Sequence, residues 1–312
     1  MNALAIDLGG SHATCAVVRD ESVLISSIVR ADGNGNLLSV LPAIRDELRR
    51  LTQAVEISVP SCEGLAFGFC GIVDSRAKRV LSTSKKFDDA VNLDLASWCR
   101  SCFGLPFAIE NDARMALLGE VAFGAAKGAC DAVMITLGSG IGGAAVIDGK
   151  LLNSKHGQAG TLGGHMPVVL GGRLCGCGNL GCAEAEASTC FLAEIYASHQ
   201  NGVAGILAGA SKLDFAQLFA AADHGDKVAR ATLDHCIHVW SALCVALIHA
   251  YDPEVLIVGG AVSKRAEDFL PTMQSYVKKY AWTPWGQVQL RRGGLGDQAA
   301  LLGAIPLLRA NR

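Results

Sequence analysis

The sequence predicts an α/β protein made of two lobes. Two segments, residues 3–18 and 135–147, each combine a strand-like apolar run, a glycine-rich turn and a second apolar run. Aligning the two segments places Leu8 over Leu137, which indicates an internal duplication of one β-hairpin. Two lobes that each open on such a hairpin are typical of an α/β protein whose two turns face a shared cleft.

The other elements follow in order along the chain. Apolar spacing predicts helices over residues 41–55, 113–125, 184–198, 215–222, 226–249 and 297–308, strands over 64–69 and 255–258, and a strand-to-helix junction at 107–112. The last helix is expected to pack back onto the first lobe, and 200–212 is the least regular stretch. The predicted lobes are therefore residues 1–112 with 297–312, and residues 113–296.

The composition limits the classes of partner. The chain has 312 residues, of which 51% are hydrophobic, enough for two cores that need no disulfide. Lysine and arginine number 27 against 29 aspartates and glutamates, so we expect a small-molecule partner and no nucleic acid. Asp7 interrupts the first apolar run, and no apolar stretch approaches about 20 residues, so we expect no signal peptide and no membrane span. Cys15, Cys70, Cys130 and Cys244 lie in apolar runs, which favours a reducing, cytoplasmic location.

The two glycine turns suit the phosphates of a nucleotide. Residues 138–143 fit G-x-G-x-x-G, but the chain then continues as a strand, whereas a dinucleotide-binding fingerprint opens a helix. Glycines let backbone N–H groups converge on an anion, and Ser11 and Ser139 add hydroxyl donors. Each turn taken alone is also what an ordinary tight hairpin requires. Two matching turns, together with Asp7 and the glycine pair at 259–260, favour the nucleotide.

A cysteine cluster predicts a metal site. Residues 171–182 form a glycine-rich loop in which Cys175, Cys177 and Cys182 are not placed as core residues. Their spacing lets three thiolates converge, and His165 is available as a fourth ligand. A Cys₃His set closes a tetrahedral zinc site with no open position, so the metal would be structural. Scattered cytosolic thiols are one alternative, and an iron–sulfur centre, which the histidine disfavours, is another.

Asp112 stands where a predicted strand meets a predicted helix. The simplest role there is to cap the helix, which Asn111 would do equally well. A carboxylate at the carboxyl end of such a strand also points toward the cleft, where it can accept a hydroxyl proton. The helix N-terminus is expected to keep this carboxylate ionised and therefore weakly basic, which phosphoryl transfer tolerates.

Four motifs together resemble the ROK family of sugar kinases and sugar-responsive repressors: Asp7-Leu-Gly-Gly10, Glu110-Asn-Asp-Ala113, Leu137-Gly-Ser-Gly-Ile-Gly-Gly143 and Cys175-Gly-Cys-Gly-Asn-Leu-Gly-Cys182. Their order covers nearly the whole chain, and the cysteine loop with its upstream Gly-His is the most specific part. The resemblance implies an actin-like, two-lobed ATPase fold, a duplicated ribonuclease H-like unit, that closes over sugar and ATP. It also implies a homodimer or homotetramer.

The resemblance further implies a role for each matching residue. Asp112 matches the catalytic base. ATP with Mg²⁺ would be held by Asp7, Gly9, Gly10, Ser11, His12, Gly138, Ser139, Gly140, Gly259 and Gly260. The sugar would be bound by Asn111, Glu184, His165 and Gly71. Structural zinc would be held by His165, Cys175, Cys177 and Cys182, and would fix the loop that presents the sugar ligands.

Of the segments that depart from the family pattern, two bear on the choice of sugar. Family kinases usually have Gly-Glu-x-Gly-His where this chain has residues 160–165, so Thr161 and Leu162 stand in place of a sugar-binding glutamate. Glucose is therefore not fixed as the substrate. Lys85 and Lys86 occupy the region where relatives usually carry apolar contacts to the sugar edge. They allow a charged sugar or amino sugar, although a Lys-Lys pair is more often a solvated face.

Three other classes stay open. The family's repressors carry an N-terminal helix-turn-helix domain, for which a strand beginning near Met1 leaves no room. A sugar-binding sensor without kinase activity would have the same fold, and turnover of ATP distinguishes it. An activator ATPase of the same superfold would hold an iron–sulfur cluster, which a colourless protein excludes. The sequence favours an ATP-dependent kinase that phosphorylates a hydroxyl of a hexose or hexose derivative.

Overall fold

The computed structural model describes residues 1–83, 85–200, 202 and 204–311. The chain divides into two compact units, each of which has its own sheet and its own helices. Unit 1 comprises residues 1–128, 150–161 and 294–312, and unit 2 comprises residues 129–149 and 162–293.

Unit 1 is built on a five-stranded sheet with the order β3-β2-β1-β4-β7. Its strands are β1 (Asn2–Leu8), β2 (His12–Arg19), β3 (Ser22–Arg30), β4 (Cys62–Phe69) and β7 (Phe107–Asn111). Two further short strands, β5 (Ile72–Asp74) and β6 (Arg79–Ser82), pair with each other in a separate antiparallel sheet. β1 and β2 are antiparallel, with Leu8 opposite Ala13, whereas β4 is parallel to β1 and to β7. The predicted first hairpin is confirmed.

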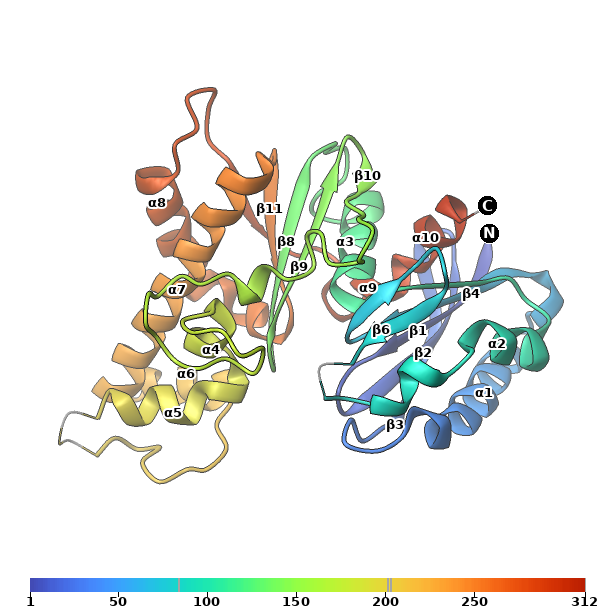
Figure 1. Ribbon diagram of the computed structural model, residues 1–312, viewed down its shortest axis with the longest axis horizontal. Helices are drawn as coiled ribbons and strands as arrows, with labels where there is room; N and C mark the ends of the chain where they lie inside the picture. Colours follow the sequence, from blue (N-terminus) through green and yellow to red (C-terminus); the bar gives the residue numbers. More distant parts are fainter. Residues whose placement is uncertain (84, 201, 203, 312) are drawn as a thin grey trace. The chain divides into compact units, whose positions relative to one another are not determined.

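Helices cover both faces of this sheet (Figure 1). The helices of unit 1 are α1 (Leu37–Ala54), α2 (Leu95–Phe103), α3 (Asp112–Phe123), α9 (Ala299–Leu302) and α10 (Ala304–Ala310). α1 and α2 pack on the face that contains Ile6 and Phe67, and α3, α9 and α10 pack on the face that contains Ala3 and Ala66. The C-terminal segment thus returns to the first unit.

The boundary between the units differs from the predicted one after residue 112. α3 packs so closely against α9 that a Cβ atom on Gly119 would overlap the carbonyl oxygen of Ala299. A Cβ atom on Gly303 would likewise overlap the carbonyl oxygen of Met115. Backbones approach this closely only where glycine removes the side chain. Because of this packing, residues 113–128 belong to unit 1 rather than to the second lobe.

Unit 2 repeats the strand arrangement of unit 1. Its sheet has the order β10-β9-β8-β11-β12. The strands of this sheet are β8 (Ala132–Leu137), β9 (Ile141–Ile147), β10 (Lys150–Leu151), β11 (Val255–Gly259) and β12 (Gln289–Arg292). β8 and β9 form an antiparallel hairpin, β11 is parallel to β8, and β12 is parallel to β11. The same order of one hairpin and two parallel strands occurs in unit 1, so the predicted duplication is confirmed.

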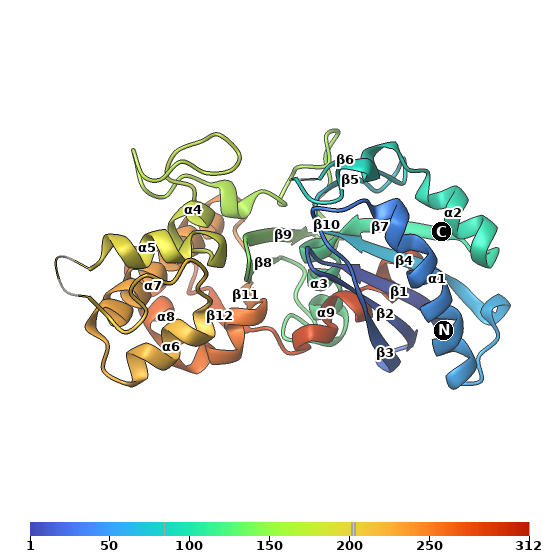
Figure 2. The same ribbon diagram turned by 90° about the horizontal axis from the view of Figure 1, so that it is seen from below.

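A buried helix organises the core of unit 2. The helices of this unit are α4 (Ala183–Ala187), α5 (Leu192–Ser198), α6 (Phe215–Asp223), α7 (Lys227–Tyr251) and α8 (Leu270–Tyr280). Figures 1 and 2 both show α7 between α5 and α8. Trp240 of α7 is fully buried, with the ring centroids of Phe215 and Phe269 at 5.2 and 5.3 Å.

One prediction about the helices of unit 2 needs correction. The single helix expected over residues 184–198 is interrupted at Ser188, where the backbone is extended. α7 matches the helix expected over residues 226–249, and it meets the length and composition of a membrane-spanning helix. However, 61% of its most apolar window is buried inside the structure, as in the core helix of a globular unit.

Candidate active site

The first glycine turn follows β1 in unit 1. Gly9 N donates a hydrogen bond to His12 O at 3.0 Å, and Gly33 N donates to Gly10 O at 2.9 Å. The turn is therefore fixed by a hydrogen bond within it and by a second one from the segment after β3. Ser11 and His12 are exposed, with Ser11 Oγ 3.0 Å from His12 Nδ1. A hollow of about 430 Å³ adjoins Gly10 and Ser11 and leaves room for a ligand at this turn.

Asn111 and Asp112 have separate roles at the junction of β7 and α3. Asn111 is the N-cap of α3, because its Oδ1 accepts a hydrogen bond from Arg114 N at 3.2 Å. Asn111 Nδ2 donates to Gly71 O at 3.1 Å and to Asp112 Oδ1 at 2.8 Å. Ala113 N also donates to Asp112 Oδ1, at 2.8 Å. The capping residue thus orients the Asp112 carboxylate, which is not itself required as the cap.

The carboxyl groups at this end of the sheet have raised pKa values. Burial, together with the charges of Asp112 and Asp297, raises the pKa of Asp7 to about 7. Burial also raises the pKa of Asp112, although the hydrogen bond from Ala113 N and the charge of Lys86 oppose this. The expectation that the helix N-terminus keeps Asp112 a weak base was wrong, because desolvation outweighs the amide hydrogen bonds. A carboxylate with a raised pKa is the better proton acceptor near neutral pH.

A buried ion pair that the sequence analysis missed supports this junction. Glu110 and Arg114 are each 2% exposed, and Glu110 Oε1 lies 2.8 Å from Arg114 Nε. Arg114 Nη1 also donates to the carbonyl oxygens of Leu152 at 2.7 Å and Ala159 at 2.9 Å. The pair therefore fixes the backbone on both sides of Asp112. The sequence feature that could have predicted this ion pair was the i, i+4 spacing of a glutamate and an arginine at a helix start.

The second glycine turn joins β8 to β9 in unit 2. Gly138 N donates to Gly140 O at 3.0 Å, and the chain continues as β9, so the turn is not a dinucleotide-binding fingerprint. Glu184, at the start of α4, accepts a hydrogen bond from Ile141 N at 3.0 Å, and its carboxylate fills the space that a Cβ atom on Gly140 would need. Gly260, with φ of +82°, packs against the backbone of the last residue of β8.

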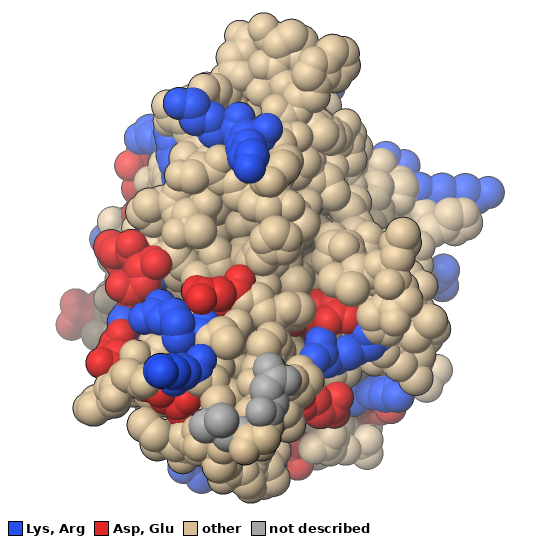
Figure 3. Space-filling view, turned by 90° about the vertical axis from the view of Figure 1, so that its left-hand side faces the viewer, with Lys and Arg blue, Asp and Glu red and all other residues tan. Residues whose placement is uncertain are grey.

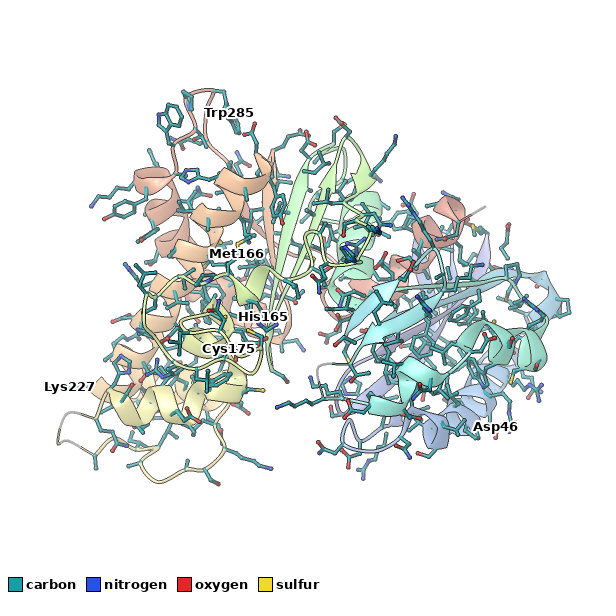
Figure 4. The ribbon with its side chains drawn as sticks, in the orientation of Figure 1. Asp46, His165, Met166, Cys175, Lys227 and Trp285 are labelled. Atoms are coloured by element: carbon teal, nitrogen blue, oxygen red, sulfur yellow. The ribbon has the colours of Figure 1, made fainter. Side chains whose placement is uncertain are left out.

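The predicted metal ligands lie together in unit 2. Figure 4 shows His165 and Cys175 close to each other in the segment before α4. The donor atoms of His165, Cys175, Cys177 and Cys182 all lie within 4.8 Å of one another. Cys175 Sγ lies 3.5 Å from His165 Nδ1, and Cys177 Sγ lies 3.6 Å from Cys182 Sγ. Donors around tetrahedral zinc, with bonds of about 2.0–2.3 Å, are spaced by about 3.5 Å. These residues therefore fit a structural zinc ion.

The structure groups the predicted site residues in two sets. The set in unit 1 consists of Asp7, Gly9, Gly10, Ser11, His12, Gly71, Asn111 and Asp112. The set in unit 2 consists of Gly138, Ser139, Gly140, His165, Cys175, Cys177, Cys182, Glu184, Gly259 and Gly260. Within unit 2, His165 Nδ1 faces a cysteine sulfur, so Nε2 is the ring nitrogen that stays available to a ligand.

Known proteins match this chain over nearly its whole length. The sequence profile of the ROK family matches residues 3–311. A glucokinase from Thermotoga maritima is 30% identical over 316 residues, which cover 98% of this chain and 96% of that protein. An N-acetylmannosamine kinase from Salmonella arizonae is 29% identical, covering 100% of this chain and 99% of that protein. Among solved structures, a ROK family glucokinase from Streptomyces griseus in complex with glucose and AMPPNP matches this chain with a TM-score of 0.84. The two sequences are 29% identical, and the match covers 99% of this chain and 100% of that chain.

Proposed function

Because the chain belongs to the ROK family and has an actin-like ATPase fold, we propose that it is an ATP-dependent sugar kinase with Asp112 as its general base. The observation that carries the proposal is the junction of β7 and α3. There Asn111 caps the helix and orients Asp112, whose pKa is raised by burial. The kinases among the similar proteins support transfer to a sugar, and the AMPPNP complex of the Streptomyces griseus enzyme supports ATP as the donor.

In the proposed step, a hydroxyl oxygen of the sugar forms a bond to the γ-phosphorus of ATP. The bond between that phosphorus and the β,γ-bridging oxygen breaks, and ADP leaves with the electron pair. The hydroxyl proton passes to the Asp112 carboxylate, for which a raised pKa is favourable. Phosphoryl transfer has a loose transition state, so positioning and charge neutralisation contribute most of the catalysis. The Glu110–Arg114 pair serves positioning by fixing the backbone around Asp112.

Binding roles are proposed for the remaining site residues. Both glycine turns, with Asp7, His12 and the glycine pair at 259–260, would bind ATP through backbone amides and hydroxyl groups. Mg²⁺ would be held by the ATP phosphates, because this ion prefers phosphate oxygens and retains several waters. The sugar would be bound by Asn111, Gly71, Glu184 and His165. Zinc on the Cys₃His set would make the loop before α4 rigid and supply no open coordination position.

The partners and location follow from the same proposal. On the face drawn in Figure 3, acidic and basic side chains are interspersed, which suits a small-molecule partner better than nucleic acid. A cytoplasmic location and assembly as a homodimer or homotetramer stay predictions. The sugar is a hexose or hexose derivative, and Thr161 and Leu162, in place of a glutamate, leave glucose and N-acetylmannosamine as competing candidates.

A coupled ADP-release assay tests the proposal directly. Purified protein with Mg-ATP would be measured against hexoses, N-acetylated amino sugars and ketoses, with zinc quantified on the same sample. We expect sugar-dependent ADP release with at least one sugar. Asp112→Asn should lower kcat by at least about 100-fold, since general base catalysis typically contributes this much. AMPPNP affinity should stay unchanged, because asparagine can still accept the hydrogen bonds made to Oδ1.

Asp46→Asn is the matched control for this variant. Asp46 is an exposed residue of α1, and the same chemical change there should leave kcat unaltered. Retention of most of the activity by Asp112→Asn would remove this residue from the mechanism. If the wild-type protein binds AMPPNP but releases no ADP with any sugar, the kinase proposal fails in favour of a sensor or a catalytically silent binding protein.

A further inference from the structure

The loop that follows β6 has an unusual backbone around Lys86. Lys85 and Phe87 both have positive φ, +62° and +56°, in the left-handed region that bulky side chains rarely adopt. The Phe87 side chain is fully buried, and Phe87 N donates to Gly33 O at 2.7 Å. Such conformations persist only where the surroundings impose them, and they cluster at ligand-binding and active sites.

The rest of this loop is also tied to its surroundings. Lys86 N donates to Thr83 O at 2.9 Å, and Thr83 Oγ1 donates to the Asp88 carboxylate. The Asp89 carboxylate accepts hydrogen bonds from the first two amide groups of α1, at 2.7 and 2.9 Å. These contacts fix the backbone on both sides of Lys86. The lysine therefore projects from a constrained position, unlike a residue of an ordinary solvated face.

The Lys86 side chain lies across two glycines of unit 1. A Cβ atom on Gly33 would be 3.3 Å from Lys86 Cγ, and one on Gly10 would be 3.0 Å from both Cε and Nζ. The half-buried ammonium group thus lies over the first glycine turn, and its charge also acts on Asp112. Within the described part of the chain, Lys86 Nζ has neither a hydrogen-bond acceptor nor an ion-pair partner. A partly desolvated cation without a partner favours an incoming anion.

We propose that Lys86 is the cation of an anion-binding subsite over the Gly10 turn, which takes a phosphoryl oxygen of the nucleotide. The identification of the anion as a phosphoryl group rests on the proposed kinase function. In that proposal ATP binds at this turn, and the acceptor hydroxyl of the sugar lies at Asp112. Close to both, the ammonium group stabilises the charge on the phosphoryl oxygens during transfer. A carboxylate or phosphate on the acceptor has the same chemistry and would meet the same ammonium group.

Three variants test the subsite. Lys86→Met removes the charge while keeping an unbranched side chain only one atom shorter, and Lys86→Arg retains the charge. Lys85→Met is the matched control, because Lys85 is the exposed neighbour and has a similar left-handed backbone. For Lys86→Met we expect a loss of about 10-fold in Mg-AMPPNP affinity by calorimetry. We also expect a loss of about 100-fold in kcat, the usual effect of removing one transition-state donor.

Lys86→Arg should retain most of both quantities, and Lys85→Met should match the wild type within about 3-fold. Equal behaviour of Lys86→Met and Lys85→Met in calorimetry and turnover would overturn the subsite. The acceptor source is examined with glucose against glucuronate, which differ in a carboxylate. If Lys86→Met raises KM for glucuronate only and leaves AMPPNP affinity unchanged, the phosphoryl assignment is overturned. Lys86 would then bind an anionic group of the acceptor sugar.

Calorimetry also separates this inference from the kinase proposal. If the wild-type protein releases no ADP with any sugar, the kinase proposal fails. AMPPNP and inorganic tripolyphosphate then still report on Lys86, and weaker binding of both by Lys86→Met would support the subsite. Wild-type protein that binds neither probe, or that binds them no better than Lys86→Met does, would overturn it.

Discussion

The carboxyl group of Asp7 makes the stability of unit 1 depend on pH. Burial and the charges of two other aspartates raise its pKa from 3.8 to about 7. Between these values the folded protein binds a proton that the unfolded chain does not bind. The free energy of unfolding therefore decreases as pH rises from about 4 to about 7. The stabilisation is fully present below the lower value and is lost above the upper one.

Replacing Asp7 with asparagine should remove this dependence. In the ligand-free protein, Asp7→Asn should be more stable than the wild type at pH 8 by roughly 2 kcal/mol, because the desolvated charge is gone. The difference should shrink toward zero at pH 4. Chemical denaturation between pH 4 and pH 8 measures it, with Asp46→Asn as the exposed control. A constant difference across this range would show that the pKa of Asp7 is not raised.

At the scale of elements, the cysteine loop has little apolar packing of its own. The small core beneath it consists of Cys175, Cys182 and Ala185, with Phe191 packed against them. Glu186, which is buried, accepts a hydrogen bond from Arg173 Nη1 and so ties the loop to α4. A loop with so few apolar contacts needs a further cross-link to be ordered, and a zinc ion on the Cys₃His set would supply one.

Cys177→Ser should release the metal and loosen the loop. We expect zinc to fall from about one ion per chain to near zero, because a tetrahedral site with three ligands binds much more weakly. Amide hydrogen exchange over residues 171–182 should then accelerate. Cys130→Ser is the control, since Cys130 is an exposed cysteine of unit 2 outside the cluster. Stoichiometric zinc in the Cys177→Ser protein would show that this cysteine is not a ligand.

At the scale of the whole molecule, unit 1 is assembled from three separate parts of the chain. One face of its sheet is covered by α9 and α10, which come from the last nineteen residues, 294–312. A Cβ atom on Gly64 of β4 would lie 2.6 Å from Leu308 Cδ2, which shows how closely α10 is docked. Unit 1 therefore cannot bury its second face until the end of the chain has returned.

Truncation of Ile305 tests this dependence. Ile305 is fully buried where α10 packs on β1, β4 and α3, so Ile305→Ala should destabilise unit 1 by about 3 kcal/mol through the lost apolar contacts and the cavity. Hydrogen exchange should rise in β1 and β2 and stay unchanged in β8 and β9. Arg309→Ala, at an exposed position of the same helix, serves as the control. Equal acceleration in both units would mean that they unfold together.

Much of the structure of this protein was predictable from the pattern of residues that are adjacent in the sequence. The apolar runs and glycine turns determined both hairpins, because alternating strands and tight turns are properties of adjacent residues. The grouping of His165 with the three cysteines was predictable for a similar reason, since the cysteines lie within eight positions in one loop. The duplication was predictable because both copies retain isoleucine, leucine and glycine where the first strand enters the turn, at positions 6, 8 and 9 and at positions 135, 137 and 138.

Only the tertiary structure decided features that depend on partners distant in sequence. α1 begins at Leu37, four residues before its predicted start, because the carboxylate of Asp89 binds its first amide groups. Residues 113–128 belong to unit 1 because α3 packs against α9. The pKa of Asp112 is raised because folding buries it, although its position at a helix start predicts the opposite. Capping, burial and charge proximity depend on distance in space, which the order of residues along the chain does not reveal.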